Sequence, residues 1–217
     1  MQGGNQTTIT DEAFIHLPNL HTLSIGGRTT ITYAAFQHLL YLRSLEMSWC
    51  DQTTITDVAF CQLTNLRILS MSGGNQNSIT DEAFCHLGNL RYLEIQWRHK
   101  STITDEVFRH LSSLEVLNMK GCYQQQITDK AFLHFTNLEA LDMSFCNQIT
   151  ITDEAFRHLS KLQTLTMERC DQTTITNWAF CHLKKLQSLD IRGCLQPTIS
   201  DAAFHQLTNL KEFPSKW

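Results

Sequence analysis

Apolar residues recur at fixed positions along the whole chain, in a unit that is illustrated by residues 127–148. An apolar group at i, i+1 and i+4 predicts a short helix with one apolar stripe. The members of this group are Ala131, Phe132 and Phe135. Leu141 and Met143 follow with a period of two, which predicts a short strand that turns one face inward. Thr128 can cap the helix with its hydroxyl, and Asp129 places negative charge in the first turn, where the helix dipole favours it.

This unit repeats with a fixed period. The phrase Ile-Thr-Asp-Glu-Ala-Phe or a variant of it starts at Ile9, Ile31, Ile55, Ile79, Ile103, Ile127, Ile151, Ile175 and Ile199. The first interval is 22 residues and the others are 24. Such a period is typical of a solenoid, in which each unit packs on its neighbours. We therefore expect residues 1–217 to form a single domain of about eight 24-residue repeats, with partial repeats at both ends and no evident caps.

The pattern Leu-x-x-Leu-x-Met-x-x-Cys-x-Gln-x-x-Ile-Thr-Asp resembles the leucine-rich repeat. In particular it is similar to the cysteine-containing subclass found in F-box ubiquitin-ligase receptors, and the resemblance runs from Gly3 to Phe213. It implies a right-handed α/β solenoid with a parallel β-sheet on the concave face and short helices on the convex face. The period is slightly shorter than usual for that subclass, and no segment outside the repeats matches an F-box. A substrate-receptor arm of a ubiquitin ligase is therefore an alternative and not the main prediction.

Composition narrows the partners that we expect. The net charge of −4 disfavours nucleic acid and anionic membranes as general partners. No apolar run approaches the roughly 20 residues that span a bilayer. The first residues, MQGGNQTTIT, have neither the basic start nor the apolar stretch of a signal peptide, so we expect a cytoplasmic protein.

Eight cysteines follow the repeat, and their positions show no pairing pattern typical of disulfides. One repeat position holds Cys50, Cys122, Cys146, Cys170 and Cys194, and another holds Cys61, Cys85 and Cys181. We interpret them as buried or half-buried thiols in a reducing compartment.

The positions that flank the strand leucines vary among repeats, whereas the framework barely changes. By strand alternation their side chains point out of the concave wall. We interpret them as a recognition surface for a protein or peptide, because other exposed positions, such as the Asp after Thr, are nearly constant. The alternative interpretation is drift on a solvated face.

A second pattern supports recognition. Acids between the strand Leu and the following Met or Ile occur only in alternate repeats, at Glu46, Glu94, Asp142 and Asp190. Three of these repeats carry an aromatic residue three positions later, where the other repeats have Gly or Arg. In one repeat Arg98 replaces the usual Cys, and a guanidinium cannot occupy a small buried site without a partner. The predicted contacts are Glu46, Trp49, Tyr92, Glu94, Gln96, Trp97, Arg98, Asp142 and Phe145.

Other chemistry is weakly supported. Seven histidines recur at one helix position, but neighbouring helices hold them roughly 10 Å apart, too far to share a metal ion. Thr-x-Thr pairs resemble ice-binding arrays, yet the second Thr is better explained as a helix cap. The sequence contains neither a phosphate-binding loop nor a nucleophile elbow, so we expect no enzyme activity, no cofactor and no metal. A structural rod that self-associates end to end is the alternative from another class.

Overall fold

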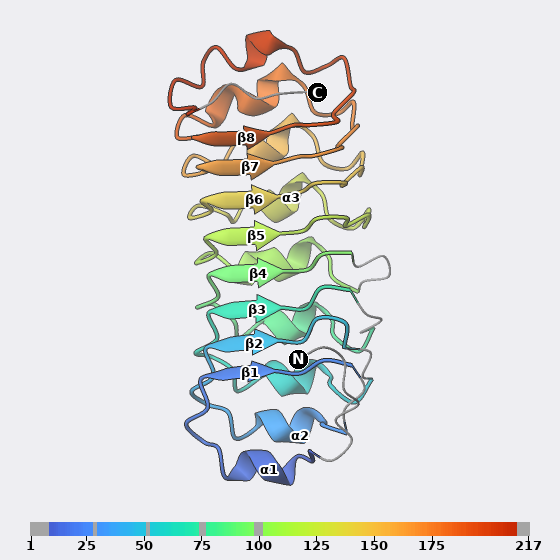
Figure 1. Cartoon of the computed structure of the whole chain (residues 1–217), viewed down its shortest axis with the longest axis vertical. Helices are drawn as coiled ribbons and strands as arrows, with labels where there is room; N and C mark the ends of the chain where they lie inside the picture. Colours follow the sequence, from blue (N-terminus) through green and yellow to red (C-terminus); the bar gives the residue numbers. More distant parts are fainter. Residues whose placement is uncertain (1–8, 28–29, 51–52, 74–76, 98–101, 212–217) are drawn as a thin grey trace.

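The structure of the protein is a computed structural model, and it describes residues 9–27, 30–50, 53–73, 77–97 and 102–211. Eight three-residue strands form one open parallel sheet in the order of the sequence, so each repeat adds one rung (Figure 1). The strands are β1 (Thr22–Ser24), β2 (Ser44–Glu46), β3 (Ile68–Ser70), β4 (Tyr92–Glu94), β5 (Val116–Asn118), β6 (Ala140–Asp142), β7 (Thr164–Thr166) and β8 (Ser188–Asp190).

Short helical turns stack behind the strands along the same axis (Figure 1). They are α1 (Glu12–Ile15), α2 (Tyr33–Phe36), η1 (Asp57–Phe60), η2 (Asp81–Phe84), η3 (Asp105–His110), α3 (Asp129–Phe132), η4 (Asp153–Phe156), η5 (Asn177–His182) and η6 (Asp201–Ala203), where η denotes a 3-10 helix. The predicted helix cap is confirmed in most repeats, since the hydroxyl of Thr128, for example, accepts the N–H of Lys130. The predicted fold class, an α/β solenoid, is confirmed.

The strands pair in exact register, with each strand leucine opposite the leucine of the next rung, as Leu93 is opposite Leu117. Neighbouring rungs of a sheet are about 4.8 Å apart. Residues at one repeat position therefore form a column that runs along the solenoid. We call the outward side of the sheet, which is the predicted concave wall, the sheet face.

Every repeat buries the same apolar positions, and these merge into one continuous core between the sheet and the helical turns. The helix phenylalanines from Phe36 to Phe180 are at most 1% exposed. Phe135 takes the place of a framework leucine and packs edge-on against Phe108 and Phe132, with ring centroids 5.3 and 5.7 Å apart. A single repeat could not cover both faces of its own core, which explains why the repeats must stack.

The aspartate that follows the capping threonine joins each helical turn to the next. Asp105 accepts hydrogen bonds from both the N–H and the hydroxyl of Thr128, at 2.8 and 2.7 Å. The same bridge joins Asp11 to Thr32, Asp57 to Thr80, Asp81 to Thr104, Asp129 to Thr152 and Asp153 to Thr176. We call these bridges the aspartate ladder.

The aspartate ladder corrects one step of the sequence argument. These carboxylates are half-buried and bridge two repeats, so the packing of the solenoid accounts for their constancy. Their constancy therefore does not show that an exposed position without a function would stay constant, which was the reason for calling the variable strand positions a recognition surface. The case for a recognition surface must therefore rest on the geometry of the sheet face itself.

The Thr-x-Thr pairs also have a role within the fold. The hydroxyl of the first Thr donates to the carbonyl oxygen of the Ile in the preceding repeat, as Thr150 does to Ile127 at 2.9 Å. The second Thr caps the helical turn. Both hydroxyls are thus used in joining repeats, which explains the Thr array without an ice-binding function.

The cysteines at the first repeat position are buried, as predicted. Each Sγ that the structure places in a hydrogen bond donates to a carbonyl about one repeat earlier, as Cys146 does to Met119 at 3.1 Å. Burial raises the pKa of the Cys146 thiol well above its ordinary value, which keeps it protonated. At the second position Cys85 and Cys181 are half-buried, but Cys61 is exposed, so the prediction was wrong for Cys61.

Candidate functional site

The sheet face presents one column of residues in which acids alternate with uncharged side chains. We call it the acid column; it consists of Ser24, Glu46, Ser70, Glu94, Asn118, Asp142, Thr166 and Asp190. Register pairing places neighbouring members on neighbouring rungs, so the acids lie two rungs apart. Two rungs correspond to about 10 Å, which limits repulsion between the carboxylates.

Most acids of this column have a local structural task that the sequence analysis did not foresee. Glu46 accepts the backbone N–H of Ser48 at 2.9 Å, and Asp142 accepts that of Ser144 at 2.9 Å. Asp190 does the same for Arg192, whose guanidinium also donates to this carboxylate and lowers the pKa of Asp190. These carboxylates satisfy N–H groups where the strands end. Two of the predicted contact residues, Glu46 and Asp142, are therefore explained in part by folding alone.

Glu94 differs from the other acids because, among the described residues, it accepts from three different side chains and from no backbone N–H. It accepts hydrogen bonds from Tyr92 Oη at 3.0 Å, from Gln96 Nε2 at 2.6 Å and from Ser70 Oγ at 3.1 Å. Burial, the bond to Glu94 and the charges of Glu94 and Glu46 raise the pKa of Tyr92 to about 12. The structure thus brings together Tyr92, Glu94 and Gln96 of the predicted cluster. Arg98, the remaining charged member, lies outside the described residues.

A left-handed residue follows closely after each of the eight strands, and we call this column the turn row. Its members are Gly27, Trp49, Gly73, Trp97, Gly121, Phe145, Arg169 and Gly193, with φ between 53° and 71°. A side chain at such a φ costs about 1–2 kcal/mol, and glycine avoids this cost. The sequence analysis recognised the alternation of large residues and glycine, but not the backbone conformation that the two share.

Packing explains why glycine alternates with large residues in the turn row. A Cβ atom added at Gly73 would lie 2.7 Å from the indole of Trp49, and one added at Gly121 would lie closer still to the indole of Trp97. A Cβ atom at Gly193 would lie 2.8 Å from Cγ of Arg169. Each of these large side chains therefore covers the glycine of the next rung.

The middle of the turn row forms an aromatic and cationic cluster. The Trp97 and Phe145 ring centroids are 5.7 Å apart, with the rings tilted by 49°. Lys120 Nζ lies 5.2 Å and Arg169 Cζ 5.6 Å from the Phe145 centroid, within the range of cation–π contacts. Trp49, in contrast, is 66% exposed. The predicted contacts thus form two neighbouring groups, one around Glu94 and one around Phe145, with Trp49 at a distance of two rungs from Trp97.

Within the described part of the chain, no group of three or more His, Cys, Asp or Glu side chains is arranged to hold a metal ion. None of the described helices is long and apolar enough to cross a membrane.

These columns repeat a sequence unit that a known family shares. The family model described as a leucine-rich repeat region matches residues 41–215, which is most of the chain. The protein belongs to the leucine-rich repeat family. A search of curated proteins found no match for this leucine-rich repeat protein.

Solved structures agree with this assignment. A crystal structure of a TLR13–ssRNA13 complex matches with a TM-score of 0.74 and 27% sequence identity, over 93% of this chain and 29% of that chain. The Toll–Spatzle complex from Drosophila matches with a TM-score of 0.68 and 15% identity, over 96% of this chain and 34% of that chain. The second likeness shows the fold alone. This leucine-rich repeat protein therefore spans only about a third of the length of each of those chains, of which one was solved in complex with ssRNA13 and the other in complex with Spatzle.

Proposed function

We propose that this leucine-rich repeat protein is a non-enzymatic scaffold that binds a protein or peptide through its sheet face. The contacts would centre on the large residues of the turn row and on the adjoining group of Tyr92, Glu94 and Gln96. The observation that carries the proposal is that Trp49, Trp97 and Phe145 occupy left-handed positions that glycine fills in alternate repeats.

The large residues of the turn row cost stability. Each requires about 1–2 kcal/mol to hold a side chain at positive φ, whereas Gly27, Gly73 and Gly121 serve the same turn without it. Trp49 regains little of this cost through burial, because its side chain remains largely exposed. Strain that the fold does not need is a reason to infer function.

The residue types of this surface are those that bind proteins. Tryptophan and tyrosine dominate the binding energy of protein interfaces, where rigid rings fill pockets of the partner. Lys120 and Arg169 flank Phe145, and Glu94 lies in the neighbouring column, so charged groups of both signs surround the rings. Such a surface suits a partner with an apolar anchor and polar groups around it.

One comparison favours a second candidate ligand, which is single-stranded RNA, since TLR13 was solved in complex with ssRNA13. Aromatic side chains can stack on bases, and Lys120 and Arg169 could contact phosphates. The acids of the sheet face and the net charge of −4 would, however, repel a phosphate backbone. We therefore favour a protein ligand. The ubiquitin-ligase and self-assembling alternatives stay predictions.

Matched variants can test the proposal. Glycine at the turn row is native to alternate repeats, so Trp49→Gly and Trp97→Gly should keep the backbone while removing the rings. Trp178→Ala removes a 74% exposed indole from the helical side and is the control. Each folded protein would capture partners from host lysate, and each captured protein would then be purified and titrated against the same variants.

We expect a partner whose Kd rises at least about tenfold with each glycine variant and is unchanged by Trp178→Ala. Equal affinity for all variants would exclude the turn row as the binding site. Fluorescence anisotropy with a labelled single-stranded RNA is run in parallel. Tight RNA binding that the glycine variants abolish would replace the protein ligand by RNA. Capture of no protein by any folded bait would instead favour the self-assembling rod.

A further inference from the structure

A second column, which includes five charged residues, lies directly before the strands, at the ends opposite to those that the turn row follows. We call it the entry column; it consists of His21, Arg43, Arg67, Arg91, Glu115, Glu139, Gln163 and Gln187. The backbone holds its members on consecutive rungs, since Arg67 N donates to the Arg43 carbonyl at 2.8 Å and Arg91 N to the Arg67 carbonyl at 2.9 Å. The spacing between neighbours is thus one rung, about 4.8 Å.

The charges of the entry column form blocks. Three arginines stand directly before β2, β3 and β4, and two glutamates stand directly before β5 and β6. Like charges on neighbouring strands destabilise a sheet. The acid column of the same sheet avoids this by placing its acids two rungs apart. The block arrangement of the entry column therefore does not stabilise the solenoid, and the binding of a charged ligand would explain it.

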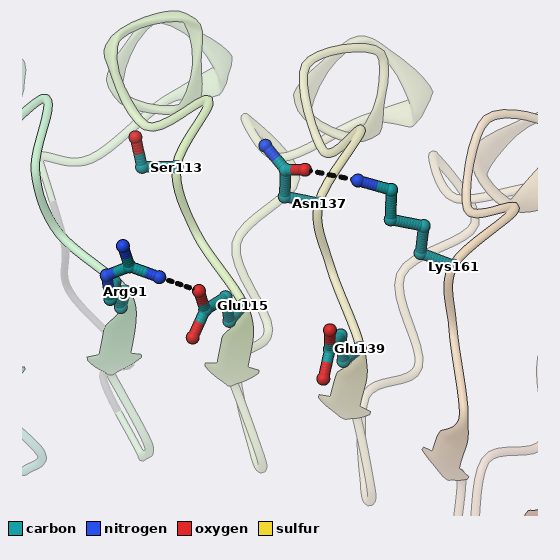
Figure 2. Close-up of a pocket in the computed structure, with 6 residues that line it drawn as sticks. All are labelled: Arg91, Ser113, Glu115, Asn137, Glu139 and Lys161. Atoms are coloured by element: carbon teal, nitrogen blue, oxygen red, sulfur yellow. Dashed lines mark hydrogen bonds and ion pairs between the residues drawn. The ribbon is translucent and has the colours of Figure 1, made fainter.

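Within the described part of the chain, the two blocks are paired only at their junction. Arg91 Nη1 forms an ion pair with Glu115 Oε1 across neighbouring rungs (Figure 2). Among the described residues, no ion pair involves Arg43 or Arg67, and both side chains are exposed. Figure 2 likewise shows the Glu139 carboxylate apart from the neighbouring side chains that it draws. Each block thus keeps charge available for a partner.

Two adjoining hollows follow these blocks. The smaller, of about 130 Å³, is lined by Asn65, Arg67, Asn89, Arg91 and Ser113, a set with two guanidinium groups and no carboxylate. The amides of Asn65 and Asn89 donate to the Leu40 and Thr64 carbonyls at 2.8 and 2.9 Å, which fixes this wall. Guanidinium groups suit the geometry of carboxylates and phosphates. The smaller hollow is therefore shaped for an oxyanion.

The larger hollow, of about 370 Å³, shares Arg91 and Ser113 with the smaller one and continues past the glutamates. Its remaining lining residues are Glu115, Asn137, Glu139 and Lys161 (Figure 2). Lys161 Nζ donates to Asn137 Oδ1 at 2.6 Å and so points to the side of this hollow away from Glu139. Along the edge, a ligand would meet positive charge first and carboxylates second.

We propose that the entry column binds an extended peptide segment with an acidic block over Arg43, Arg67 and Arg91 and basic residues over Glu115 and Glu139. Two rungs span about 10 Å, which an extended peptide covers with about three residues. About three acidic residues would therefore be followed by basic ones within the next three. A nucleic acid fits less well, because its uniform negative charge would meet the two glutamates.

The probe for this test is a fluorescein-labelled peptide, Glu-Glu-Glu-Gly-Lys-Lys, together with its reversed sequence, since the direction along the edge is open. Fluorescence anisotropy at low ionic strength would measure its binding to the full chain. The variant Arg43→Glu/Arg67→Glu reverses the unpaired positive charges, and Arg109→Glu/Arg157→Glu makes the same change in net charge on the helical side. Circular dichroism checks the fold, and Arg67→Gln serves as a milder second variant.

We expect saturable binding of one of the two peptides, with a Kd that rises about tenfold or more in the first double variant and less than twofold in the control. Added salt should weaken it. Trp97→Gly should leave it unchanged, which separates this proposal from that for the turn row. Equal losses in both double variants, no binding of either peptide, or tighter binding of single-stranded RNA at the same column would each overturn the proposal.

Discussion

Removal of one bridge of the aspartate ladder tests how strongly these hydrogen bonds join the repeats. Asp105→Ala removes both carboxylate oxygens, which accept hydrogen bonds from the backbone N–H of Thr128 at 2.8 Å and from its hydroxyl at 2.7 Å. A hydrogen bond to a charged group contributes about 1.5–3 kcal/mol, and water can replace part of each bond at this half-buried site. We therefore expect the free energy of unfolding to fall by about 2–3 kcal/mol.

The chain itself supplies the comparison for an amide. Asn177 occupies the aspartate position in one repeat, where Oδ1 accepts the Ser200 N–H at 2.8 Å and Nδ2 donates to Ser200 Oγ at 2.9 Å. An amide thus keeps both contacts, with the bond to the hydroxyl reversed in direction and without the negative charge. We expect Asp105→Asn to cost no more than about 1 kcal/mol.

A change to aspartate at a position that lacks it should add one bridge to the aspartate ladder. Tyr33 holds the aspartate position in one repeat, so that position offers no carboxylate to the N–H and hydroxyl of Thr56 in the next repeat, whose hydroxyl also makes no cap bond. Tyr33→Asp supplies the missing acceptor and should stabilise the protein by about 1–2 kcal/mol, reduced by the lost contacts of the half-exposed tyrosine ring.

Urea unfolding followed by circular dichroism measures these three changes. Glu106→Ala is the control, because Glu106 is exposed and its ion pair with Arg109 lies on the surface, so its loss should cost less than about 0.5 kcal/mol. Equal costs for Asp105→Ala and Asp105→Asn would refute the bridge and point to the helix dipole instead. A loss below 0.5 kcal/mol for Asp105→Ala would show that water replaces the ladder at no cost.

Three further predictions concern the sheet face and the core. Trp97→Gly should change the free energy of unfolding by less than about 1 kcal/mol in urea, because the relief of left-handed strain offsets the lost ring contacts, and a larger loss would show that the ring serves stability. Tyr92 should deprotonate near pH 12 in an absorbance titration of tyrosinate, so its contribution to the free energy of unfolding should be complete below pH 10 and fade as the pH rises from 10 to 12. Glu94→Gln should bring the pKa of Tyr92 closer to 10. An unchanged titration in this variant would contradict the role of the carboxylate. Gln148→Leu should raise the free energy of unfolding by about 1 kcal/mol, because the buried amide has no hydrogen-bond partner among the described residues, and destabilisation would refute this.

The sequence predicted the features that depend on period and polarity. The strands, the helical turns, the buried phenylalanines and the Thr caps each follow from a pattern within one repeat. Asp105 shows the limit of such reasoning, because its partner Thr128 is 23 residues away. Only the stacking of repeats brings the two together, and an exposed acid at a helix start looks the same with or without that bridge.

The left-handed backbone conformation of the turn row was not predicted, for a different reason. A glycine in a repeated turn suggests positive φ, but Trp97 or Arg169 at the same position hides it, since such residues rarely adopt that conformation. Alignment of the repeats by column could have shown the signal, because a position that alternates between glycine and large residues implies one shared backbone. The same alignment shows the charge blocks of the entry column. They were not predicted because only positions beside the strand leucines were considered as contacts.

The in-register stack makes the order of residues down a column as informative as the residues themselves. In the acid column, charges two rungs apart are compatible with stability, and their hydrogen bonds to strand-end N–H groups provide a folding reason for most of them. In the turn row the large side chains at positive φ cost stability, and in the entry column the adjacent like charges do. Because hydrogen bonds to the backbone explain most of the acid column, whereas neither large side chains at positive φ nor adjacent like charges stabilise the fold, ligands should be sought at the two ends of the strands more than at their middle.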